Sequence, residues 1–114
     1  MKAEDVAFVG DLAYRVPALM PALQEHLDDY DSLLPHVFMG DVSRWVVERY
    51  CATPDDQDLH ALLDFIESTF ETLGNEDREL IMASFLENLP RTGESGAGVW
   101  ELIGPTLREA GLPD

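Results

Sequence analysis

A row of ionisable side chains marks one face of the segment 54–73. His60, Asp64, Glu67 and Glu71 follow one another at intervals of three or four residues, the spacing that places side chains on one face of a helix. A histidine with three carboxylates could bind a metal, transfer protons or attract a cationic partner. The apolar residues of the same segment fall on the opposite face and predict its core side: Leu59, Leu62, Leu63, Ile66, Phe70 and Leu73.

A metal site at His60 and Asp64 would need further ligands from elsewhere in the chain. No second histidine is followed four residues later by a carboxylate, and His26 and His36 lie on other predicted helices. The aspartates near His60 lack the glycine and terminal glutamate of a calcium-binding loop. We therefore predict neither a metal nor another cofactor, and a small metal-dependent hydrolase is kept only as an alternative.

Catalytic nucleophiles and phosphate-binding loops are poorly represented. The run GESGAG at 93–98 resembles a nucleophile elbow, but Ala97 stands where the second glycine is required. The run also lacks the Lys-Ser/Thr pair of a phosphate loop. Asp64 and Glu67 are predicted to be exposed, where a raised carboxyl pKa is not expected. Cys51 ends a predicted helix, whereas reactive thiols favour a helix N-terminus. We predict that the protein is not an enzyme.

Every periodic segment of the chain has the spacing of a helix, and none alternates as a strand would over a useful length. We predict an all-α fold, a compact bundle of five to six antiparallel helices. Residues 1–114 are expected to form a single helical domain. The predicted helices span residues 4–14, 19–30, 34–51, 54–73, 75–89 and 99–110, and Gly104-Pro105 should kink or divide the last one.

Capping residues and prolines indicate where the helices begin. Thr53 and Pro54 predict a hydroxyl cap followed by proline in the first turn. Asn75 is predicted to cap the next helix after a tight turn. Ser32 or a nearby residue is expected to cap the third helix.

Acidic residues dominate the composition. The 114 residues include 23 aspartates and glutamates but only 7 lysines and arginines, a net charge of -16. Such a field disfavours direct contact with nucleic acid or an anionic membrane and favours a basic protein partner, although solubility is a simpler explanation. One cysteine excludes an internal disulfide framework, and no apolar run reaches the length of a membrane span. We predict a cytoplasmic location, and the oligomeric state stays open.

A second acidic cluster, Asp28, Asp29 and Asp31, lies at the end of the predicted helix 19–30. Carboxylates are unfavourable there because the helix dipole is already negative at its C-terminus. This placement indicates either a partner-binding surface or a solvated turn.

Three stretches, LLPHVFMGDVSRWV, LIMASFLENLP and LIGPTLREAGL, together with the acidic helical pattern, resemble a group of small, functionally uncharacterised bacterial proteins. Similar small acidic proteins often serve as immunity partners of secreted bacterial toxins. The resemblance covers most of the chain from Leu33 onward and implies a helical fold. Its residues mainly build the core, so it implies no catalytic residues.

The sequence therefore favours a non-enzymatic immunity or inhibitor protein that neutralises a basic toxin enzyme. We expect the partner-binding residues to be the two acidic groups described above. A nucleic-acid mimic that occupies a DNA- or RNA-binding protein is the second hypothesis, and a scaffolding domain or homodimer stays open. The residues predicted to bind the partner are Asp28, Asp29, Asp31, His60, Asp64, Glu67 and Glu71.

Overall fold

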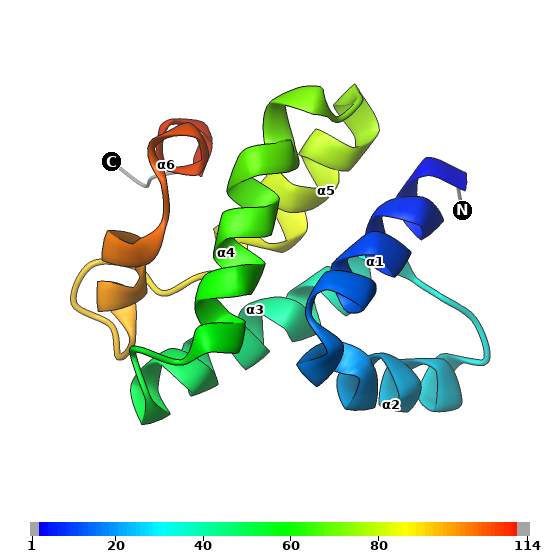
Figure 1. The fold of residues 1–114 in the computed structure, drawn as a ribbon, viewed down its shortest axis with the longest axis horizontal. Helices are drawn as coiled ribbons and strands as arrows, with labels where there is room; N and C mark the ends of the chain where they lie inside the picture. The colour runs from blue at the N-terminus through cyan, green and yellow to red at the C-terminus, as the bar shows by residue number, and fades with distance from the viewer. Residues whose placement is uncertain (1–2, 112–114) are drawn as a thin grey trace.

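The computed structural model describes residues 3–111, and within them every regular element is a helix, which confirms the all-α prediction. Six α-helices are joined by turns and by four segments of 3-10 helix in this part of the chain (Figure 1). Their bounds are α1 (Ala3–Arg15), η1 (Pro17–Leu19), α2 (Met20–Tyr30), α3 (Pro35–Ala52), α4 (Gln57–Thr69), η2 (Phe70–Thr72), α5 (Asn75–Ser84), η3 (Leu86–Asn88), η4 (Ala97–Leu102) and α6 (Pro105–Gly111).

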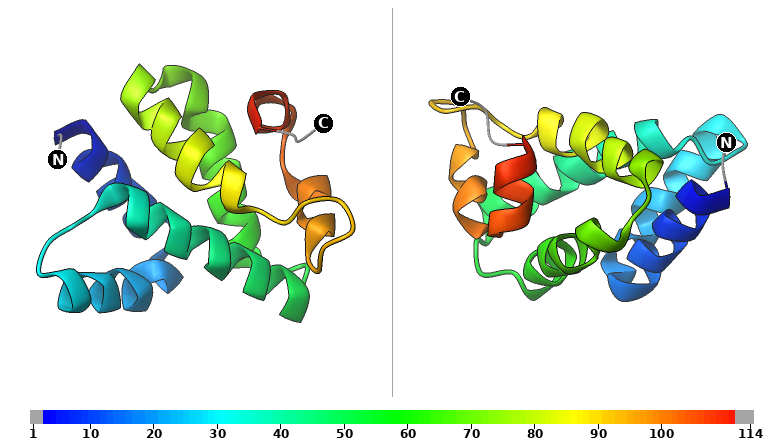
Figure 2. Two further views of the ribbon diagram at one scale, coloured as in Figure 1. Left: turned by 180° about the vertical axis from the view of Figure 1, so that it is seen from behind. Right: turned by 90° about the horizontal axis from the view of Figure 1, so that it is seen from above.

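The helices pack around α3, the longest of them, which has 18 residues. Helix α4 crosses in front of α3 and α5 (Figure 1). Helices α1 and α2 lie at one end of the molecule, and η4 and α6 lie at the other (Figure 2). As a result, α4 lies between the N-terminal and C-terminal parts, and both ends of the chain can pack against it.

The turn between α1 and α2 is sharp because Pro17 and Pro21 cannot both continue one helix. Val16 leaves the helical conformation, and the segment from Pro17 to Tyr30 bends away from α1 by 111°. Among residues 3–111, no single helix is long and apolar enough to cross a membrane. Only this bent pair reaches the necessary length and composition together.

One contiguous apolar core joins the helices. Leu80 and Ile81 are both fully buried, so α5 is covered on more than one side. Further fully buried side chains come from α1, η1, α3, α4 and the segment after α5: Leu12, Leu19, Phe38, Met39, Leu59, Leu62, Ile66 and Phe85.

The start of α4 differs from the prediction. Thr53 is the C-cap of α3, and Pro54 lies in a turn rather than in the first turn of a helix. The N-cap is Asp56, whose Oδ1 accepts the backbone N–H of Leu59 at 3.0 Å. Aspartate is at least as good a cap as threonine, and the turn at Pro54 lets the chain reverse direction before α4 begins.

Two other helix starts also lack the side-chain cap expected from sequence. The N-cap of α3 is Leu34, and its N–H donates to Nε2 of the buried His26 at 2.9 Å, so Ser32 is not the cap. The N-cap of α5 is Gly74 in an extended conformation, and Asn75 is the first helical residue. At the start of α3 the acceptor for the Leu34 N–H is thus a side chain eight residues earlier in the chain, and local sequence patterns do not reveal it.

The break predicted at Gly104-Pro105 is confirmed, because η4 ends at Leu102 and α6 begins at Pro105. The loop before η4 turns at Gly96, which has a φ of 85°. Glycine adopts this left-handed conformation without strain. The two short helices therefore pack as separate pieces at one end of the molecule.

Candidate partner-binding surface

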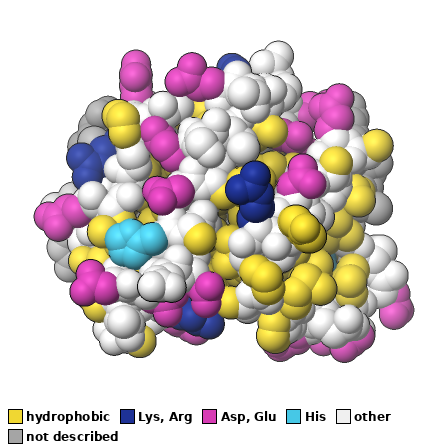
Figure 3. Space-filling model, in the orientation of Figure 1, with side chains coloured by type: hydrophobic (Ala, Val, Ile, Leu, Met, Phe, Trp, Pro, Cys, Tyr) yellow, Lys and Arg dark blue, Asp and Glu magenta, His cyan; other side chains and the backbone are white. Residues whose placement is uncertain are grey.

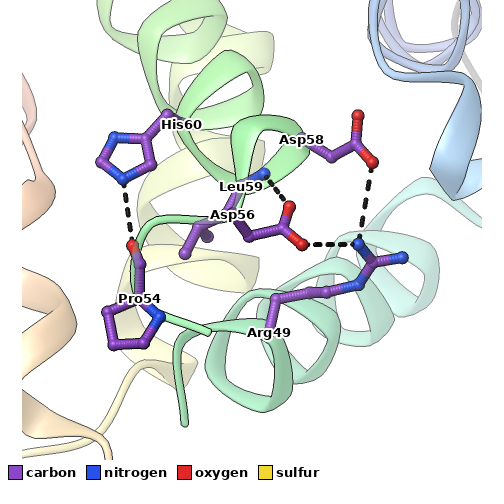
Figure 4. Close-up of polar contacts among 6 residues, drawn as sticks. All are labelled: Arg49, Pro54, Asp56, Asp58, Leu59 and His60. Atoms are coloured by element: carbon purple, nitrogen blue, oxygen red, sulfur yellow. Dashed lines mark hydrogen bonds and ion pairs between the residues drawn. The ribbon is translucent and has the colours of Figure 1, made fainter. Parts of the chain in front are cut away.

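The predicted row has His60, Asp64 and Glu67 on α4 and Glu71 in η2, and its members differ in what they contact. Asp64 is exposed and makes no ion pair or hydrogen bond within residues 3–111. His60 is half-buried, and its Nε2 donates to the carbonyl of Pro54 at 3.0 Å (Figure 4). This bond ties the first turn of α4 to the turn that precedes it.

Glu67 is bound by the C-terminal helix α6. Its two carboxylate oxygens accept the backbone N–H groups of Thr106 and Leu107, each at 2.9 Å. Burial disfavours the charged form, but these hydrogen bonds outweigh it and hold the pKa of Glu67 below its ordinary value. Glu71 reaches the same turn, where its Oε1 accepts the Thr106 hydroxyl at 3.3 Å. The fold therefore gives Glu67 a structural role that the sequence pattern did not indicate.

Arg49 organises the junction between α3 and α4. Its guanidinium donates to Asp56 Oδ2 at 2.9 Å and lies 3.7 Å from Asp58 Oδ2 (Figure 4). The same group stacks over the Trp45 ring at 4.8 Å. The hydrogen bond from the Leu59 N–H lowers the pKa of Asp56 below its ordinary value. Burial raises this pKa, and the hydrogen bond and charge of Arg49 lower it further. Arg49 therefore pairs with two carboxylates of the segment that begins α4.

The other arginines are also turned back onto the chain. Of the six arginines within residues 3–111, five contact a ring, a carboxylate or a backbone carbonyl. The arginine ion pairs of this part of the chain involve only Asp41, Asp56 and Asp58. Besides Arg49, the contacts are Arg15 over the Phe65 ring, Arg44 with Asp41, Arg78 with the carbonyls of Phe70 and Glu71, and Arg108 with the Trp100 carbonyl.

Within residues 3–111, most surface carboxylates therefore have no arginine paired with them. On the face seen in Figure 3 they occur over and around α4, while apolar side chains gather over α1 and the start of α2. Two exposed apolar residues of that region are Tyr14, at 83% exposure, and Met20, at 48%. The combination of a negative field with local apolar surface is suited to binding a basic protein.

The predicted cluster on α2 is exposed as expected. Asp31 is the C-cap of α2 with a φ of 60°, and Asp28 accepts a hydrogen bond from Gln24 at 3.0 Å. Asp29 lies with Glu25 beside a groove of about 410 Å³ between α2 and α3. Asp41 and Glu48 lie on the α3 side of this groove. The cluster is thus part of a larger acidic surface that includes α3.

A third acidic group was not identified from the sequence as a site. Asp77 is buried, with 5% of its surface exposed, and its Oδ1 has no hydrogen-bond partner among the described residues. Burial, a hydrogen bond with Asp5 and the charges of Asp5, Glu4 and Glu76 raise the pKa of Asp77 to about 7. Asp77 precedes the buried Leu80 and Ile81 by three and four residues, and this spacing was the signal available in the sequence.

The groove beside Asp77 runs between α1 and α4. It has a volume of about 630 Å³, and its apolar lining includes Phe8, Phe65 and Leu73. The Phe8 and Phe65 rings stack with their centroids 6.3 Å apart. Glu4 and Asp77 supply carboxylates to the lining.

A metal centre is not formed by the described side chains. Within residues 3–111 no group of three or more histidine, cysteine, aspartate or glutamate residues is arranged to hold a metal ion. Cys51 is a free, exposed thiol in the last turn of α3. His60 and Asp64 therefore gain no further ligand from the fold within those residues.

Residues 9–112 match the family described as a domain of unknown function, DUF7674. Because the match covers most of the chain, the protein belongs to that family. No curated protein and no solved structure matches the chain.

Proposed function

We propose that this member of the DUF7674 family is a non-enzymatic inhibitor that binds a basic protein partner through its acidic surface. In the specific form that we favour, the partner is a bacterial toxin enzyme, and the protein protects the cytoplasm of its host by covering the toxin's active site. The surface consists of the acidic group on α2 and the row on α4, with Asp64 as its most accessible member.

The observation that supports the proposal is that most of the arginines contact groups of the chain itself. Some of the 23 acidic side chains could be neutralised locally if the arginines lay among the surface carboxylates. Five of the six arginines in residues 3–111 instead contact rings, backbone carbonyls or the three aspartates near them. Uncompensated carboxylates repel one another, which costs stability. A basic partner would remove that repulsion on binding, and the same field would accelerate the encounter.

Growth rescue tests the proposal. The product of the reading frame adjacent to the gene in its native genome should be expressed alone and together with this protein. We expect the product to be basic, to arrest growth alone and to be harmless with its partner. Arrest that this protein does not relieve would count against the immunity function for that product.

Charge variants then locate the surface. Replacing Asp28, Asp29, Asp31 and Asp64 by asparagine should weaken rescue, because these exposed side chains have no ion pair within residues 3–111. A matched control removes the same number of charges elsewhere, at exposed carboxylates of the C-terminal part and of η3: Glu87, Glu94, Glu101 and Glu109. Equal loss in both variants would mean that total charge, rather than these residues, determines binding.

Glu67 and Glu71 stay within the predicted surface but are poor positions for this test. Replacing Glu67 would disturb α6 as well as the charge. Asp64 lies about one turn before Glu67 on α4 and makes no such contact. The single variant Asp64→Asn therefore separates the effect of charge on α4 from an effect on folding.

A further inference from the structure

The groove between α1 and α4 has an unusual end. Glu4 lies near Gly74, because its Oε2 would be 3.3 Å from a side chain added there. Asp77, in the first turns of α5, lines the same groove. Arg15 lies eleven residues after Glu4 on α1, about 16 Å away along the helix axis. The groove is therefore acidic at the Glu4 and Asp77 end, while Asp11 and Arg15, four residues apart on α1, line it further along.

The acidic end requires a hydrogen-bond donor. Oδ1 of Asp77, which lines the groove, is buried and has no partner within residues 3–111. When Asp77 is ionised its carboxylate only accepts hydrogen bonds, so any group that then satisfies this oxygen must donate. The ionised form of Asp77 is also repelled by the nearby negative charges of Asp5, Glu4 and Glu76. A cationic donor would form a hydrogen bond with this oxygen and would also offset the repulsion. A neutral donor would form the hydrogen bond but leave the repulsion in place.

The rest of the groove requires an apolar stem. Phe8 and Leu73 line it, and the Phe65 ring of the lining is covered by the Arg15 guanidinium at 5.5 Å from its centroid. A long alkyl chain with a terminal charge covers such a surface while its charged end reaches the polar group. An ammonium group has three donors around one nitrogen and can serve carboxylates on different side chains, whereas a guanidinium suits one carboxylate in a plane.

We propose that this groove is the docking site for a lysine side chain of the basic partner, with the ammonium group bound by Asp77 and Glu4 and the alkyl stem lying over Phe8 and Leu73. This inference rests on the proposed function only for the source of the lysine. The groove itself can be tested without the partner.

Butylammonium, which has the structure of a lysine side chain, is the probe for the first test. We expect saturable chemical-shift changes at the amides of Glu4, Phe8 and Asp77 when it is titrated into the ¹⁵N-labelled full chain. Butanol, which has no charge, and ammonium, which has no stem, should give none. Butylguanidinium separates the two basic side chains: tighter binding than butylammonium would overturn the choice of lysine.

Binding should depend on pH. Asp77, with Asp5, Glu4 and Glu76 around it, has a pKa of about 7, so the charged fraction grows about tenfold between pH 6 and pH 8. We expect the affinity for butylammonium to rise by about the same factor. No saturable binding at pH 8, or shifts confined to other surfaces, would overturn the proposal.

Two variants and one control identify the carboxylates. Asp77→Asn should abolish both the binding and its dependence on pH, and it removes a repulsive charge, so the variant should fold. Glu4→Gln changes an exposed side chain and should weaken binding without removing the pH dependence. Glu109→Gln, an exposed change on α6, should have no effect. Unchanged affinity in both groove variants would overturn the proposal.

The chain's own lysine must also be tested. Lys2 lies outside the described residues, so its position relative to the groove is open. If Lys2→Gln increases the affinity for butylammonium several-fold, the groove is occupied by this lysine and the proposal is overturned. Unchanged affinity supports an external lysine.

The purified partner separates the groove from the wider function. If the groove is the lysine site, Asp77→Asn should weaken binding of the partner, and butylammonium should compete with the partner for the groove. A partner that binds Asp77→Asn as tightly as the natural chain would overturn the groove proposal and leave the proposed function standing. Conversely, butylammonium binding with no basic partner recovered would support the groove and overturn the proposed function.

Discussion

The carboxylate of Glu67 and the backbone N–H of Leu107 are joined by a 2.9 Å hydrogen bond across 40 residues of the chain. The second oxygen of Glu67 accepts the neighbouring Thr106 N–H. Together these bonds satisfy two of the N–H groups that the first turn of α6 leaves without an intrahelical partner. A side chain of α4 thus does for α6 what a local capping residue normally does.

Glu67→Ala should lower the free energy of unfolding by about 1–2 kcal/mol, the usual effect of losing a helix cap. Faster amide hydrogen exchange at Thr106 and Leu107 should accompany the loss, since those N–H groups lose their acceptors. Glu71→Ala is the matched control, because it removes only a 3.3 Å contact with a hydroxyl. Equal effects of the two variants on α6 would contradict the capping role.

The contribution of Glu67 should also depend on pH. Its folded-state pKa is lowered, so its contribution is present above the unfolded pKa and is lost as the pH falls through the folded one. Denaturation with urea at pH 7 and at about pH 3 measures it. The difference between the natural chain and Glu67→Ala should shrink at the lower pH; a constant difference would show that the charged form is not what stabilises α6.

Gly104 allows this carboxylate to approach. A Cβ at Gly104 would lie 2.5 Å from Cδ of Glu67, closer than non-bonded atoms can be without displacement. Gly104→Ala should therefore displace Glu67 and destabilise α6 by an amount similar to Glu67→Ala. Because both changes break the same contact, the double variant should lose less than the sum of the two. Full additivity in the double-mutant cycle would show that the two residues act independently.

Asp77 should have the opposite dependence on pH. Its pKa is raised from 3.8 to about 7, so its contribution to stability is present below its unfolded pKa and is lost as the pH rises through about 7. Asp77→Asn should therefore unfold at higher temperature than the natural chain at pH 8, with the advantage fading toward pH 4. A ¹³C titration of the Asp77 carboxyl checks the pKa directly. A value near 4 would contradict the buried pairing with Asp5.

The start of α4 gives a further comparison. Asp56→Ala should lower the melting temperature, because it removes both the cap of α4 and the partner of Arg49. Thr53→Ala should change it little, because Thr53 is the C-cap of α3 and its hydroxyl makes no hydrogen bond within residues 3–111. The opposite ranking would favour the cap predicted from sequence.

The helices and their buried faces could be predicted because they depend on local spacing. Apolar residues such as Leu62 and Ile66 recur at helical intervals, and both are fully buried. The N-cap residues were harder to predict, because capping also depends on which side chains from other helices pack nearby. His26 reaches the N–H of Leu34 from another helix, and nothing in the residues around Leu34 indicates this contact.

The candidate surface was limited in the same way. Helical spacing correctly places Asp64 and Glu67 on one face of α4, but it does not say what packs against that face. Helix α6 packs there, and its residues Thr106 and Leu107, which are 39 and 40 residues further along the chain, bind Glu67. An acidic residue in the first turn of a helix, such as Asp77, is common on the protein surface, but Asp77 is buried beside Asp5, and local spacing does not reveal this.

The central claim, that the acidic surface binds a basic protein, is tested most directly by isolating the tagged protein from its native host. Isolation should be carried out at low ionic strength and again at about 0.5 M salt, where exposed charges are largely screened. We predict one stoichiometric basic partner at low ionic strength and much less of it at high salt. Recovery of the protein without a stoichiometric partner, or with an acidic partner retained equally at both concentrations, would contradict the claim.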